Sequence, residues 1–370
     1  MSARFLTVVL ERAFNMRDGF GREIDYMRIS EIDSCNLNCY YCNPCDNNEH
    51  CHALNILSVK EVLCIVRAAT RLGIKHFRLT GGEPLLHPQL DEMVLQIKKI
   101  PGVSSVSLTT NAVLLVQHAK WLKEAGIDSI NVSLDTIDAS EYERITKKPL
   151  LEEVKHGINA AIECGIRVKI NVVLTPQTDV VALTRYVAKK GTDIRFIEMM
   201  PVGEGHTNGV EPYKKVIGTL SKLYGEPCRI NTEKTKEINS GNDKRKIPDN
   251  GPAEYYIFPE LGIRVGLIQA IHGKFCDTCN RIRVTADGRL MPCLGSSVTM
   301  DLVPDSWDFA DDVEKDFAIV RALRAAIKAK PRCHNFNDNA VTYTKTTETK
   351  TTEIEAAEVN AARNMSRIGG

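Results

Sequence analysis

Three cysteines near the amino terminus are spaced as ligands of an iron–sulfur cluster. Cys35, Cys39 and Cys42 are separated by three and two residues. In a chain with 12 cysteines among 370 residues, such a pattern arises by chance with odds of about 1%. Three thiolates can bind three irons of a [4Fe–4S] cube and leave the fourth iron open to a substrate or cosubstrate. A structural zinc site is the alternative. Its further ligands would come from Cys45, Cys51, His50 or His52.

A second triad lies in the last third of the chain. Cys276 and Cys279 are separated by two residues, and Cys293 follows after thirteen more. Three ligands again suggest a cluster with one open iron, whereas a closed zinc site would need a fourth ligand, such as Cys333 or His272. The spacing alone leaves the metal open.

The elements that must position these cysteines alternate between β-rich and helical segments. Strands are expected at Ile24–Ile32, Ile74–Leu79, Ser104–Thr109, Ser129–Leu134, Val168–Leu174 and Ile194–Ile197. Helices are expected at Ser58–Leu72, Leu90–Ile100, Leu114–Ala125, Leu151–Cys164 and Asp179–Lys190, several of them ending at a glycine. This alternation predicts an α/β fold, a partial (β/α)6 barrel with a parallel sheet. The first triad follows the first strand, at the end of such barrels where catalytic groups collect.

The rest of the chain has a different pattern. Residues 231–252 read as an exposed loop, and Val341–Glu353 as a poorly ordered segment. Between them we expect a helix over Val313–Lys330 and strands over 254–258, 263–268, 282–285 and 289–291. We therefore divide the chain into an N-terminal extension (1–18), the barrel (19–225), a C-terminal region with the second triad (226–345) and a tail (346–370).

The composition limits the function classes. The formal net charge is +1, which argues against a nucleic-acid-binding surface or a basic membrane anchor. No apolar run approaches the ~20 residues that span a bilayer, and Phe5–Leu10 is too short for a signal-peptide core. We therefore expect a cytoplasmic protein without nucleic-acid or membrane partners. There, free thiols are more common than disulfides.

Beyond its spacing, the first triad resembles the motif of the radical S-adenosylmethionine (SAM) superfamily, which has an aromatic residue before its last cysteine, here Tyr41. Thr80-Gly81-Gly82-Glu83-Pro84 resembles the glycine-rich stretch of that superfamily, whose backbone approaches the methionine amino group. The resemblance implies that the open iron chelates SAM and that an electron from the cluster releases the 5′-deoxyadenosyl radical.

The second triad narrows the resemblance. The run from Phe275 through Arg281 and Arg283 to Cys293 is similar to the GTP 3′,8-cyclase family of molybdenum cofactor biosynthesis. That family implies two [4Fe–4S] clusters, abstraction of the 3′ hydrogen of GTP, and closure of the ribose onto C8 to give 3′,8-cyclo-7,8-dihydroguanosine triphosphate. The second cluster would bind the guanine. An Arg-x-Arg strand beside it fits this role, because guanidinium groups bind phosphate and purine acceptors bidentately.

By position in the family's motifs, residue roles carry over. The GTP contacts would be Arg28, Arg78, Thr109, Lys169, Arg195, Arg281 and Arg283. The SAM contacts would be Tyr41, Gly82, Ser133 and Met200. The terminal Gly369 and Gly370 would reach into the active site as a catalytic tail.

The resemblance also implies partners and leaves alternatives. It implies a flavodoxin- or ferredoxin-like electron donor and a downstream cyclic pyranopterin monophosphate synthase, while the Phe5–Phe14 stretch could support a homodimer. It covers roughly residues 18–298 and the last six, with departures at Ser34, Asn43 and Ala112, where the family has Arg, Met and Gly. Cys45 and Cys51 stay unexplained. The alternatives are a peptide-modifying radical SAM enzyme with an auxiliary cluster and a non-catalytic zinc-binding module.

Overall fold

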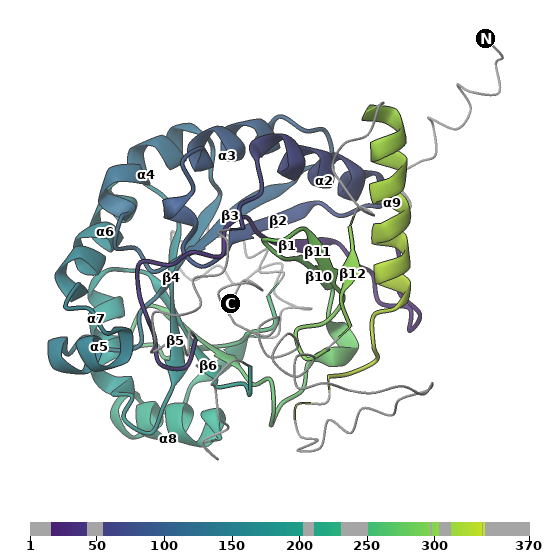
Figure 1. Ribbon diagram of the computed structural model, residues 1–370. Coiled ribbons are helices and arrows are strands. Elements are labelled where there is room, and N and C mark those ends of the chain that lie inside the picture. Colours follow the sequence, from purple (N-terminus) through teal and green to yellow (C-terminus); the bar gives the residue numbers. More distant parts are fainter. Residues whose placement is uncertain are drawn as a thin grey trace, which may run out of the picture.

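The computed structural model describes residues 16–42, 55–202, 211–230, 251–296, 298–302, 312–334 and 336. Several features named above lie outside these ranges: the Phe5–Phe14 stretch, Asn43, Cys45, Cys51, the loop over 231–250, Val341–Glu353, Gly369 and Gly370. Within the described ranges the chain builds one curved sheet with helices along its outer side (Figure 1). No helix in this part of the chain is long and apolar enough to cross a bilayer.

The sheet has twelve strands in the order β12-β11-β10-β1-β2-β3-β4-β5-β6-β9-β8-β7. Its strands are β1 (Tyr26–Ser30), β2 (His76–Thr80), β3 (Ser105–Thr110), β4 (Ser129–Ser133), β5 (Val168–Leu174), β6 (Asp193–Glu198), β7 (Cys228–Ile230), β8 (Glu254–Ile257), β9 (Arg264–Ile268), β10 (Arg281–Val284), β11 (Arg289–Met291) and β12 (Met300–Asp301). The six predicted barrel strands are β1 to β6, and all pair in parallel. The predicted α/β barrel fold is confirmed.

The strands after residue 225 join the same sheet. β10 pairs in parallel with β1, and β9 pairs in parallel with β6, so the later strands extend the barrel sheet at both of its edges. β11 and β8 then continue the sheet antiparallel. The sequence predicted β8 to β11 but not β7 or β12, and it predicted no pairing partner for any of these strands. The domain boundaries proposed above stay predictions.

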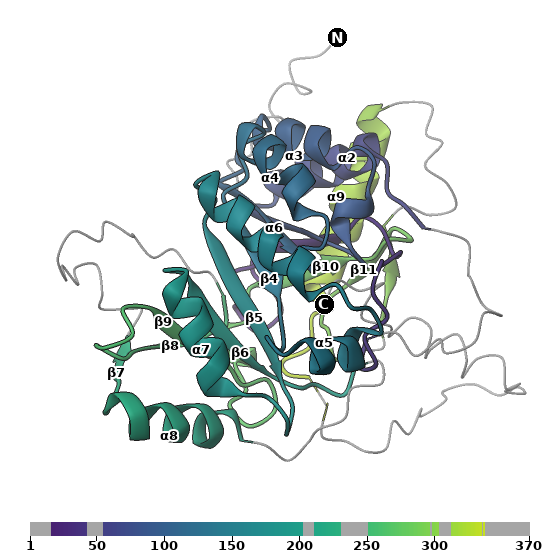
Figure 2. The same cartoon turned by 90° about the vertical axis from the view of Figure 1, so that its left-hand side faces the viewer.

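Eight α-helices are described, and most flank the outer side of the sheet (Figures 1 and 2). They are α2 (Val59–Arg71), α3 (Leu90–Lys98), α4 (Leu115–Glu124), α5 (Ala139–Thr146), α6 (Leu151–Glu163), α7 (Val180–Lys189), α8 (Pro212–Tyr224) and α9 (Asp312–Lys328). Helix α2 begins with a capping box between Ser58 and Glu61. Gly73, Gly126 and Gly165 follow helices with positive φ angles, as the sequence predicts. Helices α5 and α8 were not predicted.

Strand alternation separates the core from the cavity. On β1, Met27 and Ile29 are fully buried in the apolar layer under the helices, whereas Tyr26 and Arg28 line the space inside the curved sheet. The same period of two places Arg78 on the inner face of β2. Helix α9 packs on α2 and β11 and so covers the sheet beside the second triad (Figure 1).

Candidate functional site

A cavity of about 790 Å³ lies inside the curved sheet. Every site residue predicted from the sequence lines it, apart from the two terminal glycines, which lie outside the described ranges. The cavity brings together Cys35, Cys39, Cys42, Cys276, Cys279, Cys293, Tyr41, Gly82, Ser133, Met200, Arg28, Arg78, Thr109, Lys169, Arg195, Arg281 and Arg283. Segments separated by more than 200 residues in the chain therefore face one space.

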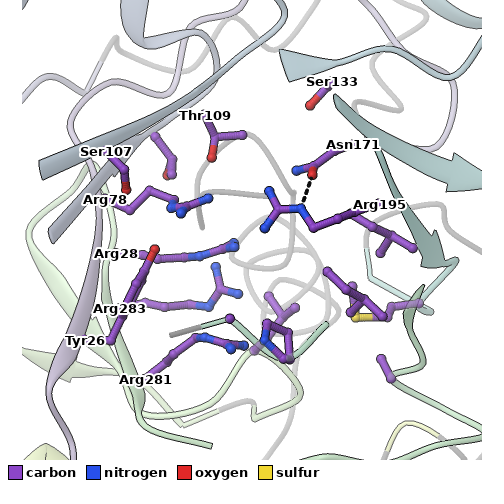
Figure 3. Close-up of a pocket in the computed structure, with 18 of the residues that line it drawn as sticks. Tyr26, Arg28, Arg78, Ser107, Thr109, Ser133, Asn171, Arg195, Arg281 and Arg283 are labelled. Atoms are coloured by element: carbon purple, nitrogen blue, oxygen red, sulfur yellow. Dashed lines mark hydrogen bonds between the residues drawn. The ribbon is translucent and has the colours of Figure 1, made fainter. Parts of the chain in front are cut away.

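Strand register places guanidinium groups in a row. Arg28 on β1 is the register partner of Arg78 on β2 and of Arg283 on β10. Neighbouring strands lie about 4.8 Å apart, so these side chains extend side by side. Arg195 reaches in from the opposite wall, where its Nε donates to Asn171 Oδ1 at 2.9 Å (Figure 3). The wall of the cavity that β10, β1 and β2 form is thus strongly cationic.

The cationic wall is largely buried, and its guanidinium groups lie beside one another. Burial and then the neighbouring Arg283 and Arg78 hold the pKa of Arg28 well below its usual value. Burial, followed by Arg281, lowers the pKa of Arg283 to about 10. Buried like charges are stable only when an opposite charge joins them. This wall is therefore suited to a polyanion.

Several buried polar atoms of residues that line this cavity have no hydrogen-bond partner in the part of the chain that the structure describes. Among them are Arg78 Nε, Arg195 Nη2 and Thr109 Oγ1. An unsatisfied buried donor costs about 1–3 kcal/mol. A ligand with several acceptor oxygens would satisfy them, so the cavity fits a phosphate-bearing substrate.

Tyr26 is a cavity residue that the sequence reasoning missed. Its ring lies 5.7 Å from the Arg78 guanidinium carbon and 5.9 Å from that of Arg281. Burial alone would raise the pKa of Tyr26, but Arg78 and Arg28 outweigh it, so the pKa lies below its ordinary value. Only the inward position in a period-two strand could have marked it.

The first triad lies where β1 ends and is supported by the glycine-rich turn after β2. Gly82 N donates to Ile32 O at 2.7 Å, and Glu83 N donates to Ser34 O at 2.8 Å. A Cβ on Gly82 would lie only 2.0 Å from Ser34 O. Glycine is therefore required for close approach to the segment that carries Cys35, in addition to any approach to a ligand.

Buried carboxylates surround the first triad. Glu83 Oε1 accepts from Thr110 Oγ1 at 2.6 Å, and burial raises the pKa of Glu83 to about 7. Asp135 accepts from Tyr41 Oη at 2.5 Å and from the Val173 amide at 2.7 Å, and burial raises its pKa to about 6. Asp135 was assigned no role from the sequence, although it lies two residues after Ser133, where β4 ends.

The thiols of the first triad share this environment. Burial raises the pKa of Cys35 to about 11. Burial and the neighbouring Cys42 raise the pKa of Cys39 well above its usual value. Cys35 Sγ accepts from the Leu37 amide at 3.5 Å. A bound cation would stabilise the thiolate forms that iron–sulfur ligation requires.

The second triad lies opposite, around a short 3-10 helix at Cys276–Thr278 and the end of β11. Burial opposes ionisation of Cys279, but Lys330 and Arg281 outweigh it, so the pKa of Cys279 lies below its ordinary value. The Arg281 guanidinium lies 5.6 Å from the Phe275 ring. Lys330 was not singled out from the sequence because nothing local in the chain marks it.

The donor sets fit iron–sulfur clusters, since each triad presents three cysteine thiols to one cavity. Neither suggested fourth zinc ligand of the second triad faces the cavity. Cys333 is exposed, and His272 Nδ1 is hydrogen-bonded to Glu198. Cys45, Cys51, His50 and His52 lie outside the described ranges.

At Ala112, one of the departures from the family pattern, the backbone conformation explains why the family has glycine. Ala112 has a φ of 65°, in the left-handed region that glycine adopts without strain. Ala112 follows Asn111, whose backbone N–H donates to Glu83 Oε2 at 2.7 Å. The turn that supports the first triad therefore carries backbone strain at Ala112.

Comparisons with known proteins match both halves of the chain. Residues 29–182 match the model of the Radical SAM superfamily, and residues 192–336 match the model described as Molybdenum Cofactor Synthesis C. A GTP 3′,8-cyclase of Clostridium perfringens (strain SM101) is 35% identical over 324 residues, which cover 87% of this chain and 95% of that protein. A GTP 3′,8-cyclase of Pelotomaculum thermopropionicum is 36% identical, covering 86% and 95%.

Among solved structures, Streptococcus suis SuiB bound to S-adenosylmethionine superposes with a TM-score of 0.54 at 14% identity. The match covers 81% of this chain and 65% of SuiB, so this chain spans just under two thirds of that protein. SuiB bound to the precursor peptide SuiA gives a TM-score of 0.53 at 14% identity. At these identities the likeness shows the fold alone.

Proposed function

Because the chain belongs to the GTP 3′,8-cyclase family of the radical SAM superfamily, we propose that its cavity holds GTP between two iron–sulfur clusters. The chain is a radical SAM enzyme that catalyses the cyclisation of GTP in molybdenum cofactor biosynthesis. It uses an iron–sulfur cluster and SAM. The residue roles, the second cluster and the protein partners below are proposals.

Cys35, Cys39 and Cys42 are the proposed ligands of the first cluster. When bound, this cluster supplies the electron that cleaves SAM into methionine and the 5′-deoxyadenosyl radical, which abstracts the 3′ hydrogen of GTP. Tyr41, Gly82, Ser133 and Met200 are the proposed SAM contacts. The hydrogen bond between Tyr41 and Asp135 fixes the ring beside Cys42 and thus shapes the SAM side of the cavity.

The observation that carries the GTP assignment is the cationic wall that β10, β1 and β2 form. The guanidinium row of Arg28, Arg78 and Arg283 lies opposite Arg195, and Arg78 Nε and Arg195 Nη2 are buried donors without a partner in the part of the chain that the structure describes. A triphosphate carries both the negative charge that suits a cationic wall and the acceptor oxygens that these two donors need. Lys169 and Thr109 line the same space and are further proposed GTP contacts.

Cys276, Cys279 and Cys293 are the proposed ligands of a second [4Fe–4S] cluster, which holds the guanine base. The lowered pKa of Cys279, to which Lys330 contributes against burial, favours the thiolate that a metal requires. With Arg281 beside it, this end of the cavity would orient the base so that C8 faces the ribose radical.

The remaining proposals rest on family membership. Gly369 and Gly370 act as a catalytic tail in the active site, a flavodoxin- or ferredoxin-like protein donates electrons, and a cyclic pyranopterin monophosphate synthase takes the product. From the sequence itself we further propose that the enzyme works in the cytoplasm, where reductants keep its thiols reduced, and that the Phe5–Phe14 stretch supports a homodimer.

The function is tested with anaerobically reconstituted protein, SAM, a reductant and GTP carrying deuterium at C3′. We expect about eight irons per chain and 5′-deoxyadenosine that contains deuterium, together with a GTP-derived product. Reactions without GTP, or with ATP in its place, are the controls. Formation of 5′-deoxyadenosine without deuterium would contradict abstraction at C3′. About four irons would contradict the second cluster.

A further inference from the structure

Lys330 is a buried lysine beside the second triad, and the function proposed above gives it no contact with GTP or SAM. Only 3% of its surface is exposed, although it lies just beyond the end of α9. Its Nζ donates to Arg281 O at 2.8 Å and to Pro292 O at 2.9 Å. It also forms a side-chain hydrogen bond with Cys279. The three N–H groups of the ammonium therefore have three acceptors.

These acceptors belong to different parts of the site. Cys279 is a proposed cluster ligand, Arg281 begins β10, and Pro292 directly precedes the ligand Cys293. One ammonium group therefore connects the segments that carry two of the three proposed ligands. Because the carbonyls of Arg281 and Pro292 are neutral, the thiolate of Cys279 is the anionic partner among these three acceptors.

Arg22 fixes the chain that follows Lys330. Its guanidinium donates to Pro331 O at 2.6 Å, to Arg332 O at 2.8 Å and to Cys276 O at 2.7 Å. Arg22 is itself paired with the buried Asp18 at 2.5 Å. The position of Lys330 is therefore set relative to the third ligand, Cys276, as well.

We propose that Lys330 is a positioning residue of the second cluster, whose ammonium aligns Cys279 and Cys293 and offsets the negative charge of the bound cluster. This inference rests on the proposed second cluster. Hydrogen bonds to the sulfurs and local charge set the reduction potential of an iron–sulfur cluster. Positive charge favours the reduced form, so Lys330 shifts the potential of the second cluster to a more positive value.

The test compares Lys330→Met, which removes the charge, with Lys330→Arg, which keeps it. Lys328→Met is the matched control, because Lys328 is exposed at the end of α9. Iron and sulfide are counted for each protein, and redox titration followed by electron paramagnetic resonance gives both cluster potentials. In Lys330→Met we expect the second cluster to favour its oxidised form about tenfold more, about 59 mV for one electron. The first cluster should not change.

The outcomes separate this inference from the proposal on which it rests. About four irons in the wild-type protein would refute the second cluster itself. With about eight irons in the wild-type protein, loss of the second cluster from Lys330→Met but not from Lys330→Arg also supports the role. An unchanged second-cluster potential in a fully loaded Lys330→Met protein would overturn the inference, as would loss of that cluster from both variants.

Discussion

The two cysteine triads face the same cavity from different electrostatic surroundings. Around the first triad are the buried carboxyl groups of Glu83 and Asp135, and burial raises the pKa of Cys35 to about 11. Around the second are Lys330 and Arg281, which lower the pKa of Cys279 in spite of its burial. The ligand type is identical, so the difference lies in the residues that surround it.

This contrast matches two different tasks. A cluster beside carboxylates gains an electron less readily and, once reduced, gives it up more readily, as reductive cleavage of SAM requires. A cluster beside cations is stabilised when its total charge is negative, which suits the binding of an anionic nucleotide. We infer that the charge around the ligands, rather than the spacing of the ligands, gives the proposed clusters at the two ends of the cavity different functions.

Removal of one ligand from each triad has the largest expected effect and tests this division. Cys39→Ser should abolish formation of 5′-deoxyadenosine, because the cluster that cleaves SAM is lost. Cys279→Ser should keep slow formation of 5′-deoxyadenosine but lose the GTP-derived product. Both compounds are quantified by chromatography with mass detection, and Cys228→Ser, at an exposed free thiol, is the control. Equal loss of 5′-deoxyadenosine in both variants would show that the triads are not functionally separate.

Neutralising one arginine of the cationic wall should have the next largest effect, on the KM for GTP. Arg283→Gln removes a charge from the buried row, so the KM for GTP should rise about 10–100-fold, as expected for lost charge-assisted hydrogen bonds. The KM for SAM should stay unchanged, because Arg283 lies on β10 at the second triad. Steady-state kinetics with each substrate varied in turn measures both values. The exposed Arg289→Gln serves as control, and an equal rise in both KM values would argue against the assignment.

The buried Glu83 should make stability depend on pH at the first triad. Burial raises its pKa from 4.5 to about 7, so between these values the folded protein keeps a proton that the unfolded chain releases. Stability should therefore fall as pH rises through this window, by about 3 kcal/mol in total. Urea unfolding at several pH values should give a flatter profile for Glu83→Gln. The exposed Glu92→Gln should keep the wild-type slope.

Relief of backbone strain at Ala112 should have the smallest effect, a small gain in the stability of the protein. Ala112→Gly should stabilise the protein by about 0.5–1 kcal/mol, because glycine adopts a positive φ without a Cβ clash. Thermal unfolding measures the gain, and the product yield should not change. Gly157→Ala should act in the opposite direction, since its Cβ would lie 2.3 Å from Ala112 O. A destabilised Ala112→Gly protein would mean that packing of the methyl group outweighs the strain.

The sequence predicts the barrel and both triads because their signals are local. The β1 to β6 strands follow from short apolar runs, and helix ends follow from glycines such as Gly73. The nucleotide contacts came only from resemblance to a family, since a single arginine in a strand says little by itself. Tyr26 and Lys330 were missed because long-range packing defines them; Lys330 is 49 residues from Arg281, its hydrogen-bond acceptor. The pairing of β9 with β6 was not predicted either, because the two strands lie far apart in the sequence.

The parallel pairing of β10 with β1 has a consequence for how the chain acquires its structure. β1 is made early, yet its second neighbour is completed only when residue 284 has been synthesised. Until then one edge of the nascent sheet exposes unpaired backbone groups, which favours association with other chains. A ribosome-bound chain that stops before β10 should therefore depend on a chaperone. The second triad, in contrast to the first, is complete only after residue 293 of 370 has been synthesised.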